Sequence, residues 1–252
     1  MKSLDKVFNI IELLKNEKSL RLQDIADSLN LNKSTTHRIL YKLVKNNYLK
    51  KDNENKKYSL GFKFLEISGF LIEDSNLIRD SRESVVKLNK LTRETIHLAM
   101  IVSDQIVYMD KKESTQGIRM YSQIGRSVPL YCTGVGKAIL AFQNHELRDK
   151  LIDTIKFYKY TDNTITNRDA LIKELEKIKK NGVALDREEH EKGIGCIAAP
   201  IRDHSNNVIA SISITALLYR MNIEKLFSFR GVLVEECRNI SKKLGFNNNT
   251  VV

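Results

Sequence analysis

The sequence predicts an α+β protein in which a small N-terminal domain and a larger C-terminal domain are joined by one helix. A length of 252 residues favours two domains over one or three. Residues 1–61 contain three short helical patterns followed by two alternating segments, whereas residues 76–252 alternate helices with strands joined by short turns. An apolar helical segment, residues 62–75, separates the two.

The composition indicates a globular protein of a reducing compartment. Hydrophobic residues make up 42% of the chain and charged residues 29%, which is ordinary for a folded domain. Asp5, Lys6 and Glu12 interrupt the N-terminal segment where a signal peptide would be apolar, and no stretch reaches the ~20 apolar residues of a membrane span. The cysteines are odd in number and far apart, which argues against a disulfide framework: Cys132, Cys196 and Cys237. We therefore expect a cytoplasmic protein without a membrane partner.

The first three helical patterns predict a helix-turn-helix. Apolar residues recur at helical spacing in a first helix (Leu4, Val7, Phe8, Ile11, Leu14) and in a short second one (Leu22, Ile25, Ala26, Leu29). Asn32 is a good N-cap for a third helix running from Lys33 to about Asn46. Two short helices joined by a tight turn would place the second of them in the major groove of DNA.

The third helix has an apolar side and a basic side. Thr36, Ile39, Leu40 and Leu43 share the inward side, and the opposite side carries hydroxyls, His37, Arg38 and lysines without a carboxylate. Residues 48–51 and 57–60 then alternate like two strands around a polar turn, which predicts a basic wing. The expected DNA contacts are Lys33, Ser34, Thr35, Thr36, His37, Arg38, Tyr41, Lys42, Lys45, Lys56 and Lys57.

Charge is concentrated in this region. Residues 1–60 hold 13 basic and 7 acidic residues, so they supply +6 of the net charge of +11. A lysine-rich genome composition explains the total charge but not its concentration, and we favour a polyanionic partner. The alternative is a three-helix bundle whose basic face is merely solvated. The tight turn, the acid-free face and the basic hairpin together favour binding to duplex DNA.

The segment after the wing is strongly apolar and predicts a linker helix. Its apolar residues are Phe62, Leu65, Ile67, Phe70 and Leu71. They fit a dimer contact or packing against the chain's own domains, and the sequence does not separate these two alternatives. A helix over 76–92 and strands over 97–102, 105–109 and 118–121 follow.

A glycine-containing loop leads into a helix that begins near Thr133. Gly134, Val135 and Gly136 would expose backbone N–H groups at the helix N-terminus, where an anion is favoured. The alternative is a tight turn in which glycine only permits close packing. A further helix covers 168–181 and is ended by Gly182.

The last strands present a row of hydroxyls. Strands are expected over 182–187, 196–202 and 208–215, and in the third Ser211, Ser213 and Thr215 share one face. That face suits an oxygen-rich ligand or, equally, an exposed edge strand. A closing amphipathic helix is expected over 223–244. The arrangement favours an antiparallel sensor domain of the GAF or PAS type, because the chain has neither a P-loop nor a dinucleotide-binding glycine fingerprint.

Three sequence blocks resemble the IclR family of bacterial transcriptional regulators. They are LQDIADSLNLNKSTTHRILYKLVKNNYL with KYSLG, VPLYCTGVGKAILA, and GVALDREEHEKGIGCIAAPIRD. The third block carries the family's signature spacing at Gly182, Asp186, Glu189, Cys196, Ile197, Ala198 and Asp203. One departure is Arg202, where the family prefers an aromatic residue or histidine.

The resemblance implies a winged helix-turn-helix (1–61), a linker helix (62–75) and a GAF/profilin-like effector domain (76–252). It implies a homodimer or dimer of dimers on a palindromic operator, repression rather than activation, and no cofactor. The effector it implies is a small carboxylate, a keto acid or sugar acid such as 2-keto-3-deoxygluconate. The family's pocket positions fall here on Gly134, Val135, Asp186, Cys196, Ser213 and Thr215.

Two other chemistries use the same residues. Cys196 with His190 and Asp186 would form a thiol nucleophile, base and orienting carboxylate of an enzyme, although their spacing is arbitrary. The same three side chains are possible zinc ligands, but they lack the paired spacing of a zinc site. We therefore expect neither an enzyme nor a metal site.

Overall fold

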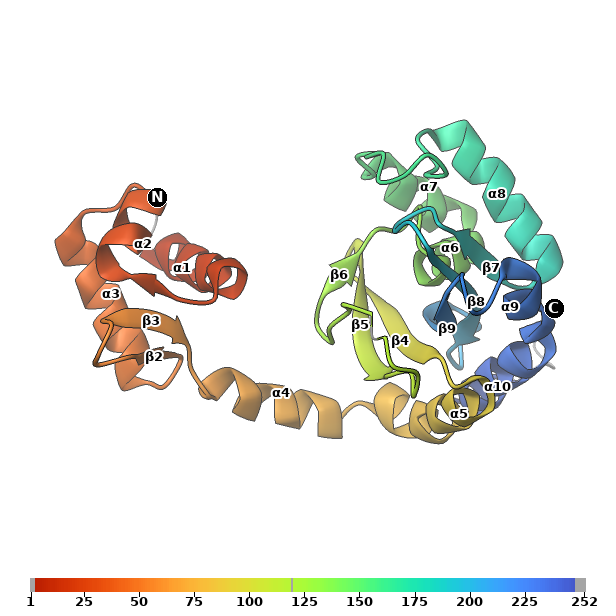
Figure 1. The fold of residues 1–252 in the computed structure, drawn as a ribbon, viewed down its shortest axis with the longest axis horizontal. Coiled ribbons are helices and arrows are strands. Elements are labelled where there is room, and N and C mark those ends of the chain that lie inside the picture. The colour runs from red at the N-terminus through yellow and green to blue at the C-terminus, as the bar shows by residue number, and fades with distance from the viewer. Residues whose placement is uncertain (1–2, 119, 248–252) are drawn as a thin grey trace. The chain divides into compact units, whose positions relative to one another are not determined.

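The computed structural model describes residues 3–118 and 120–247. Internal contacts divide the chain into two compact units, residues 1–75 and 76–252 (Figure 1), and each is described by itself. None of the helices in the described ranges is both long and apolar enough to cross a membrane.

The first unit is a helical bundle closed by a small antiparallel sheet. Its elements are α1 (Ser3–Glu17), β1 (Leu20–Arg21), α2 (Leu22–Ser28), α3 (Lys33–Lys45), β2 (Leu49–Lys51), β3 (Lys57–Leu60) and α4 (Lys63–Glu73). The strands lie in the order β1-β3-β2. The core consists of apolar side chains from α1, α2, α3 and two strands: Ile10, Leu14, Ile25, Ile39, Leu40, Leu49 and Tyr58. The expected inward side of the first helix needs correction, because Leu4 and Phe8 are exposed whereas Ile10 is buried.

The helix α4 differs from the others because it has no buried residue. Phe62, Leu65, Phe70 and Leu71 all expose more than half of their surface. Packing against the rest of the first unit therefore does not account for these side chains within its described residues.

The second unit is a six-stranded antiparallel sheet covered on both faces. Its strands are β4 (Thr95–Val102), β5 (Gln105–Lys112), β6 (Ser127–Val128), β7 (Ala184–Arg187), β8 (Ile194–Arg202) and β9 (Val208–Leu217), in the order β6-β5-β4-β9-β8-β7. Its helices are α5 (Asn76–Thr92), α6 (Gly134–Ala141), α7 (His145–Asp153), α8 (Arg168–Asn181), α9 (Ile223–Ser228) and α10 (Arg230–Lys243).

The two faces of the sheet have separate cores. The helices α5, α9 and α10 pack on one face, where Leu88, Leu226 and Ile240 meet Ile212 and Ile214 of β9. The helices α6, α7 and α8 cover the other face with Ile139, Leu140, Ile152 and Leu175. Figure 1 shows the two groups of helices on opposite sides of the sheet. The antiparallel sensor architecture expected from the sequence is confirmed.

Three expectations about this unit need correction, and one helix was not expected. Residues 118 and 120–121 form no strand, and Arg119 lies outside the described residues. The closing helix is two helices, because the chain leaves helical geometry at Phe229. The strand β9 lies in the middle of the sheet, so its hydroxyls are not on an exposed edge. The short helix α7 gave too few periodic residues to be expected.

Candidate functional site

The outward face of α3 is a row of exposed polar side chains. Asn32 caps the helix by accepting a hydrogen bond from the Thr35 N–H at 2.8 Å, as expected. Tyr41 is 62% exposed, and no carboxylate lies in α3. The other expected contacts on this face are also exposed, except for the half-buried Thr35: Lys33, Ser34, His37, Arg38, Lys42 and Lys45.

The expectation that Thr36 contacts DNA is wrong. Its side chain is fully buried, and its hydroxyl donates to the Asn32 carbonyl at 3.1 Å. The residue stands on the inward side of α3 beside Ile39 and Leu40, where it packs into the core of the unit.

The wing between β2 and β3 turns around an aspartate. Asp52 accepts backbone N–H bonds from Glu54 at 2.8 Å and Asn55 at 3.4 Å, and these bonds hold the pKa of its carboxyl below its usual value. Lys56 is exposed, but its ammonium donates to the Asn53 carbonyl at 2.5 Å, so it must turn outward to reach a phosphate. Lys57 is half-buried.

The second unit contains a cavity that brings all six expected pocket residues together. About 470 Å³ of empty space lies in this cavity and in front of its mouth, a volume that includes open solvent. Antiparallel register puts Thr215 of β9 opposite Cys196 of β8, and Cys196 opposite Asp186 of β7. The lining residues are His97, Tyr108, Met120, Tyr121, Ser122, Thr133, Gly134, Val135, Asp186, His190, Glu191, Ile194, Cys196, Ser213 and Thr215.

Both interpretations of the glycine loop apply, to different glycines. A Cβ on Gly136 would lie 2.6 Å from the Leu130 carbonyl oxygen, and its N–H bonds the Thr133 hydroxyl at 3.2 Å, so this glycine serves packing and capping. Gly134 and Val135 line the cavity at the first turn of α6. A Cβ on Gly134 would lie 2.4 Å from Cys196 Sγ, so only glycine lets β8 approach this turn.

Asp186 is the buried carboxyl of the cavity. Burial, with a smaller effect of the nearby Glu189, raises its pKa to about 7. Its Oδ1 accepts the Glu189 N–H at 2.8 Å, which ties it to the loop after β7. At neutral pH Asp186 therefore exists in both protonation states, and it can donate or accept a hydrogen bond.

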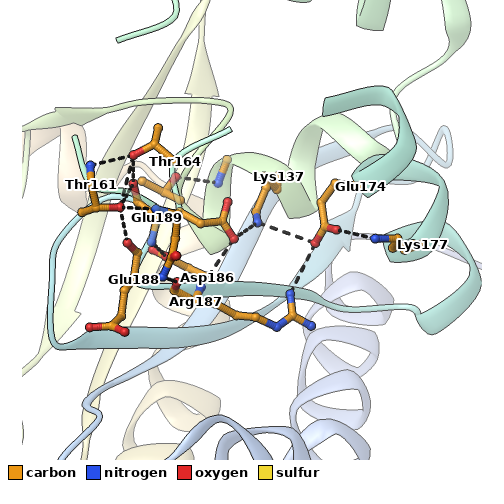
Figure 2. A network of polar contacts seen from close by, with 12 residues as sticks. Lys137, Thr161, Thr164, Glu174, Lys177, Asp186, Arg187, Glu188 and Glu189 are labelled. Atoms are coloured by element: carbon orange, nitrogen blue, oxygen red, sulfur yellow. Dashed lines mark hydrogen bonds and ion pairs between the residues drawn. The ribbon is translucent and has the colours of Figure 1, made fainter. Parts of the chain in front are cut away.

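The same loop is anchored by a lysine that the sequence analysis passed over. Lys137 of α6 is fully buried; it forms an ion pair with Glu189 and lies 3.7 Å from Glu174 of α8 (Figure 2). On the other side, the Thr164 hydroxyl donates to the Glu189 carbonyl at 2.6 Å. Helical periodicity would place Lys137 on the inward side of α6. Buried lysines are rare, however, so this burial could not be expected before its ion-pair partners were known.

His97 is the second residue that the sequence did not single out. It lies on β4 between Thr215 Oγ1, 3.2 Å from Nδ1, and Ser122 Oγ, 2.8 Å from Nε2. Its ring stacks on Tyr108 with ring centroids 4.5 Å apart. Ser213 Oγ continues the chain of contacts 3.1 Å from Thr215 Oγ1.

The three residues considered above for a thiol enzyme or a zinc site, Asp186, His190 and Cys196, line the cavity without forming a reactive site. Burial raises the pKa of the Cys196 thiol, so the thiolate that a nucleophile requires is disfavoured. His190 packs against Tyr160 with ring centroids 4.9 Å apart. Within residues 3–118 and 120–247, no three His, Cys, Asp or Glu side chains are placed to hold a metal ion.

A winged helix-turn-helix followed by an α/β domain with an antiparallel sheet is typical of bacterial transcriptional regulators. Comparison with known proteins agrees: the model of the IclR helix-turn-helix domain matches residues 3–53, and that of the bacterial transcriptional regulator IclR C-terminal domain matches residues 70–242. The chain belongs to the IclR family. It is a DNA-binding transcriptional regulator and not an enzyme.

Individual relatives cover nearly the whole chain. The HTH-type transcriptional regulator KdgR of Escherichia coli is 34% identical over 245 residues, 97% of this chain and 93% of that protein. The crystal structure of the Thermotoga maritima IclR has a TM-score of 0.80 at 34% identity, covering 96% of this chain and 98% of that one. An IclR homolog from Microbacterium hydrocarbonoxydans, solved in complex with 4-hydroxybenzoate, shares the fold with a TM-score of 0.82 at 20% identity, covering 96% and 99%.

Proposed function

We propose that a small carboxylate binds in the cavity beside α6 and changes the affinity of this regulator for its operator. The observation that carries the proposal is the meeting of two kinds of hydrogen-bond donor around one cavity. Backbone N–H groups of Gly134 and Val135 come from a helix N-terminus, and hydroxyls of Ser213 and Thr215 come from a central strand. Donors of both kinds favour an anion.

Each lining residue has a role in this proposal. The Gly134 and Val135 N–H groups hold the carboxylate, and Ser213 and Thr215 donate to its oxygens. Asp186 accepts a hydrogen bond from a hydroxyl of the effector, and Cys196 forms an apolar wall. A keto acid or sugar acid combines such a carboxylate with further oxygens. The relative complexed with 4-hydroxybenzoate, itself a small carboxylate with a hydroxyl, supports this class of ligand.

The output of the regulator is the outward face of α3. We propose that α3 enters the major groove, where Arg38 and the hydroxyls of Ser34 and Thr35 reach base edges and phosphates, while the lysines of α3 and the wing contact the backbone. Two copies joined through the exposed apolar side chains of α4 would read a palindromic operator, as a homodimer or within a dimer of dimers. We propose repression, because a dimer held on an operator excludes other proteins from that DNA.

The proposal requires that the effector bind the DNA-competent and DNA-incompetent states with different affinity. Thermal unfolding of the purified protein with a panel of small carboxylates identifies the effector class, since a ligand stabilises the state that it binds. A mobility-shift titration on a palindromic fragment from beside the protein's own gene, with and without that acid, then measures the coupling. Two results would count against the proposal. One is an affinity for duplex DNA that does not change with salt, and the other is that no carboxylate in the panel raises the unfolding temperature.

A further inference from the structure

A chain of four polar side chains crosses the cavity. It runs from Ser213 to Thr215 on β9, then to His97 on β4 and to Ser122 in the segment after β5, with steps of 3.1, 3.2 and 2.8 Å. All four line the cavity, so a ligand oxygen beside Thr215 joins the chain. The segment that carries Ser122 is fixed by Lys111, whose Nζ donates hydrogen bonds to the carbonyls of Ser122 at 2.8 Å and Met120 at 3.2 Å.

The imidazole in the middle of this chain is neutral. His97 is 2% exposed, and burial, with a smaller effect of Lys111, lowers its pKa to about 3. A neutral imidazole donates from one ring nitrogen and accepts at the other. The chain therefore has a direction, set by which nitrogen of His97 carries the hydrogen.

The position of Lys111 selects that direction. Its ammonium lies on the Nε2 side of the ring, because it binds the carbonyl of Ser122, the residue whose hydroxyl meets Nε2. A positive charge on that side favours the tautomer in which Nε2 carries the lone pair and Nδ1, the nitrogen farther from Lys111, carries the hydrogen. Ser122 then donates to Nε2, and Nδ1 donates to Thr215 Oγ1. One hydroxyl of the Ser213–Thr215 pair donates to the other across 3.1 Å, so the pair keeps one hydroxyl hydrogen to donate into the cavity.

We propose that His97 is a specificity-determining residue of the effector cavity: by donating from Nδ1 it makes the Ser213–Thr215 pair a donor, so the cavity selects a ligand oxygen that accepts at this point. The inference rests on the proposed function, since it concerns the same cavity. A keto oxygen or a carboxylate oxygen accepts the one hydroxyl hydrogen that the pair has left. An ammonium at the same place has only hydrogens to offer and leaves that hydroxyl hydrogen without an acceptor.

The test combines a spectroscopic signature with a binding ratio. The full-length protein, labelled with ¹⁵N at its five histidines, gives ring resonances in which those of His97 are identified by their loss in His97→Phe. Isothermal titration then compares 2-oxo acids with the 2-amino acids of the same carbon skeleton, using 2-oxobutanoate with 2-aminobutanoate and 2-oxohexanoate with 2-aminohexanoate. His204→Phe, at an exposed histidine, is the matched control, and Ser122→Ala removes only the far end of the chain.

The expected result is a neutral Nδ1–H ring of His97 between pH 5 and 8, and oxo acids preferred by about tenfold or more in the wild type. In His97→Phe, which keeps the aromatic packing on Tyr108, the preference falls to about threefold or less, and Ser122→Ala lies between. An Nε2–H ring, or an unchanged preference in a folded His97→Phe, overturns the inference and leaves the proposed function intact. If no oxo acid binds the wild type, the proposed function fails for these acids and the inference falls with it.

Discussion

The two surfaces that we propose to bind DNA and the effector are built in opposite ways. The face of α3 is one stretch of sequence whose polar side chains are exposed and mostly free of one another. The cavity gathers residues from five strands, the start of α6 and two loops, and several of its polar groups are buried and bound to each other. On the α3 face, contacts with DNA would therefore replace contacts with water. In the cavity, a ligand would have to fit into an ordered network of hydrogen bonds.

This difference predicts that substitutions on α3 act on DNA binding alone, while substitutions in the cavity also act on stability. An exposed side chain carries little folding free energy, and a buried polar group left without its partner carries a large penalty.

Removing the arginine of the DNA-reading face is expected to have the largest effect. Arg38→Ala should weaken operator binding by about 10- to 100-fold, corresponding to the ~1–3 kcal/mol of a base contact or the loss of a phosphate contact. Fluorescence anisotropy on a labelled operator measures the change, and the salt dependence distinguishes a phosphate contact from a base contact. The control Arg82→Ala removes an exposed arginine of α5 and should bind as the wild type does. Equal losses in both variants would mean that general charge, and not α3, carries affinity.

Filling the space at the start of α6 tests the cavity. Gly134→Ala places a methyl group 2.4 Å from Cys196 Sγ and should lower the free energy of unfolding by about 1–3 kcal/mol and weaken effector binding. Cys196→Ala in the same chain removes the clashing sulfur and should restore part of both, a coupling that a double-mutant cycle in denaturant measures. Strict additivity of the two substitutions would contradict the packing described for this turn.

The buried carboxyl predicts a pH dependence of effector binding. Because the pKa of Asp186 is raised to about 7, the protein must take up a proton to bind an anion beside it at higher pH. Affinity for a carboxylate should be level below pH 6 and fall by up to about tenfold per unit above pH 7. Isothermal titration from pH 5.5 to 8.5 should show this fall, and Asp186→Asn should remove it. A fall of the same size in the variant would assign the proton to another group.

The neighbouring threonines of α3 provide the smallest and sharpest test. Thr35 is half-buried near the helix N-terminus, whereas Thr36 is fully buried with its hydroxyl on the Asn32 carbonyl. Thr35→Val should weaken operator binding several-fold, while Thr36→Val should leave the affinity of the folded protein within about twofold and lower its unfolding temperature instead. The reverse pattern would mean that α3 is rotated relative to the face described above.

The sequence predicted the α3 surface better than the cavity because only the former follows from local periodicity. Helical spacing with Asn32 as a cap gives the outward face of α3, and it fails only at Thr36, which periodicity itself had placed inward. Gly134 and the hydroxyls of β9 were visible as a helix N-terminus and a strand face. The sequence did not reveal the roles of three further residues, His97, Ser122 and Lys137. Their roles depend on contacts with partners that lie far away in the chain, at separations of 118 positions (His97 to Thr215), 25 positions (Ser122 to His97) and 52 positions (Lys137 to Glu189).

We propose that the cavity governs the affinity of the α3 surface for DNA. The most direct measurement is the dissociation constant of the full-length protein for its operator, by anisotropy at fixed salt, with and without a saturating concentration of the carboxylate that most raises the unfolding temperature. We expect this dissociation constant to change by about 5- to 150-fold, and we expect the change to disappear in Gly134→Ala. A carboxylate that stabilises the protein yet leaves operator affinity unchanged would contradict it.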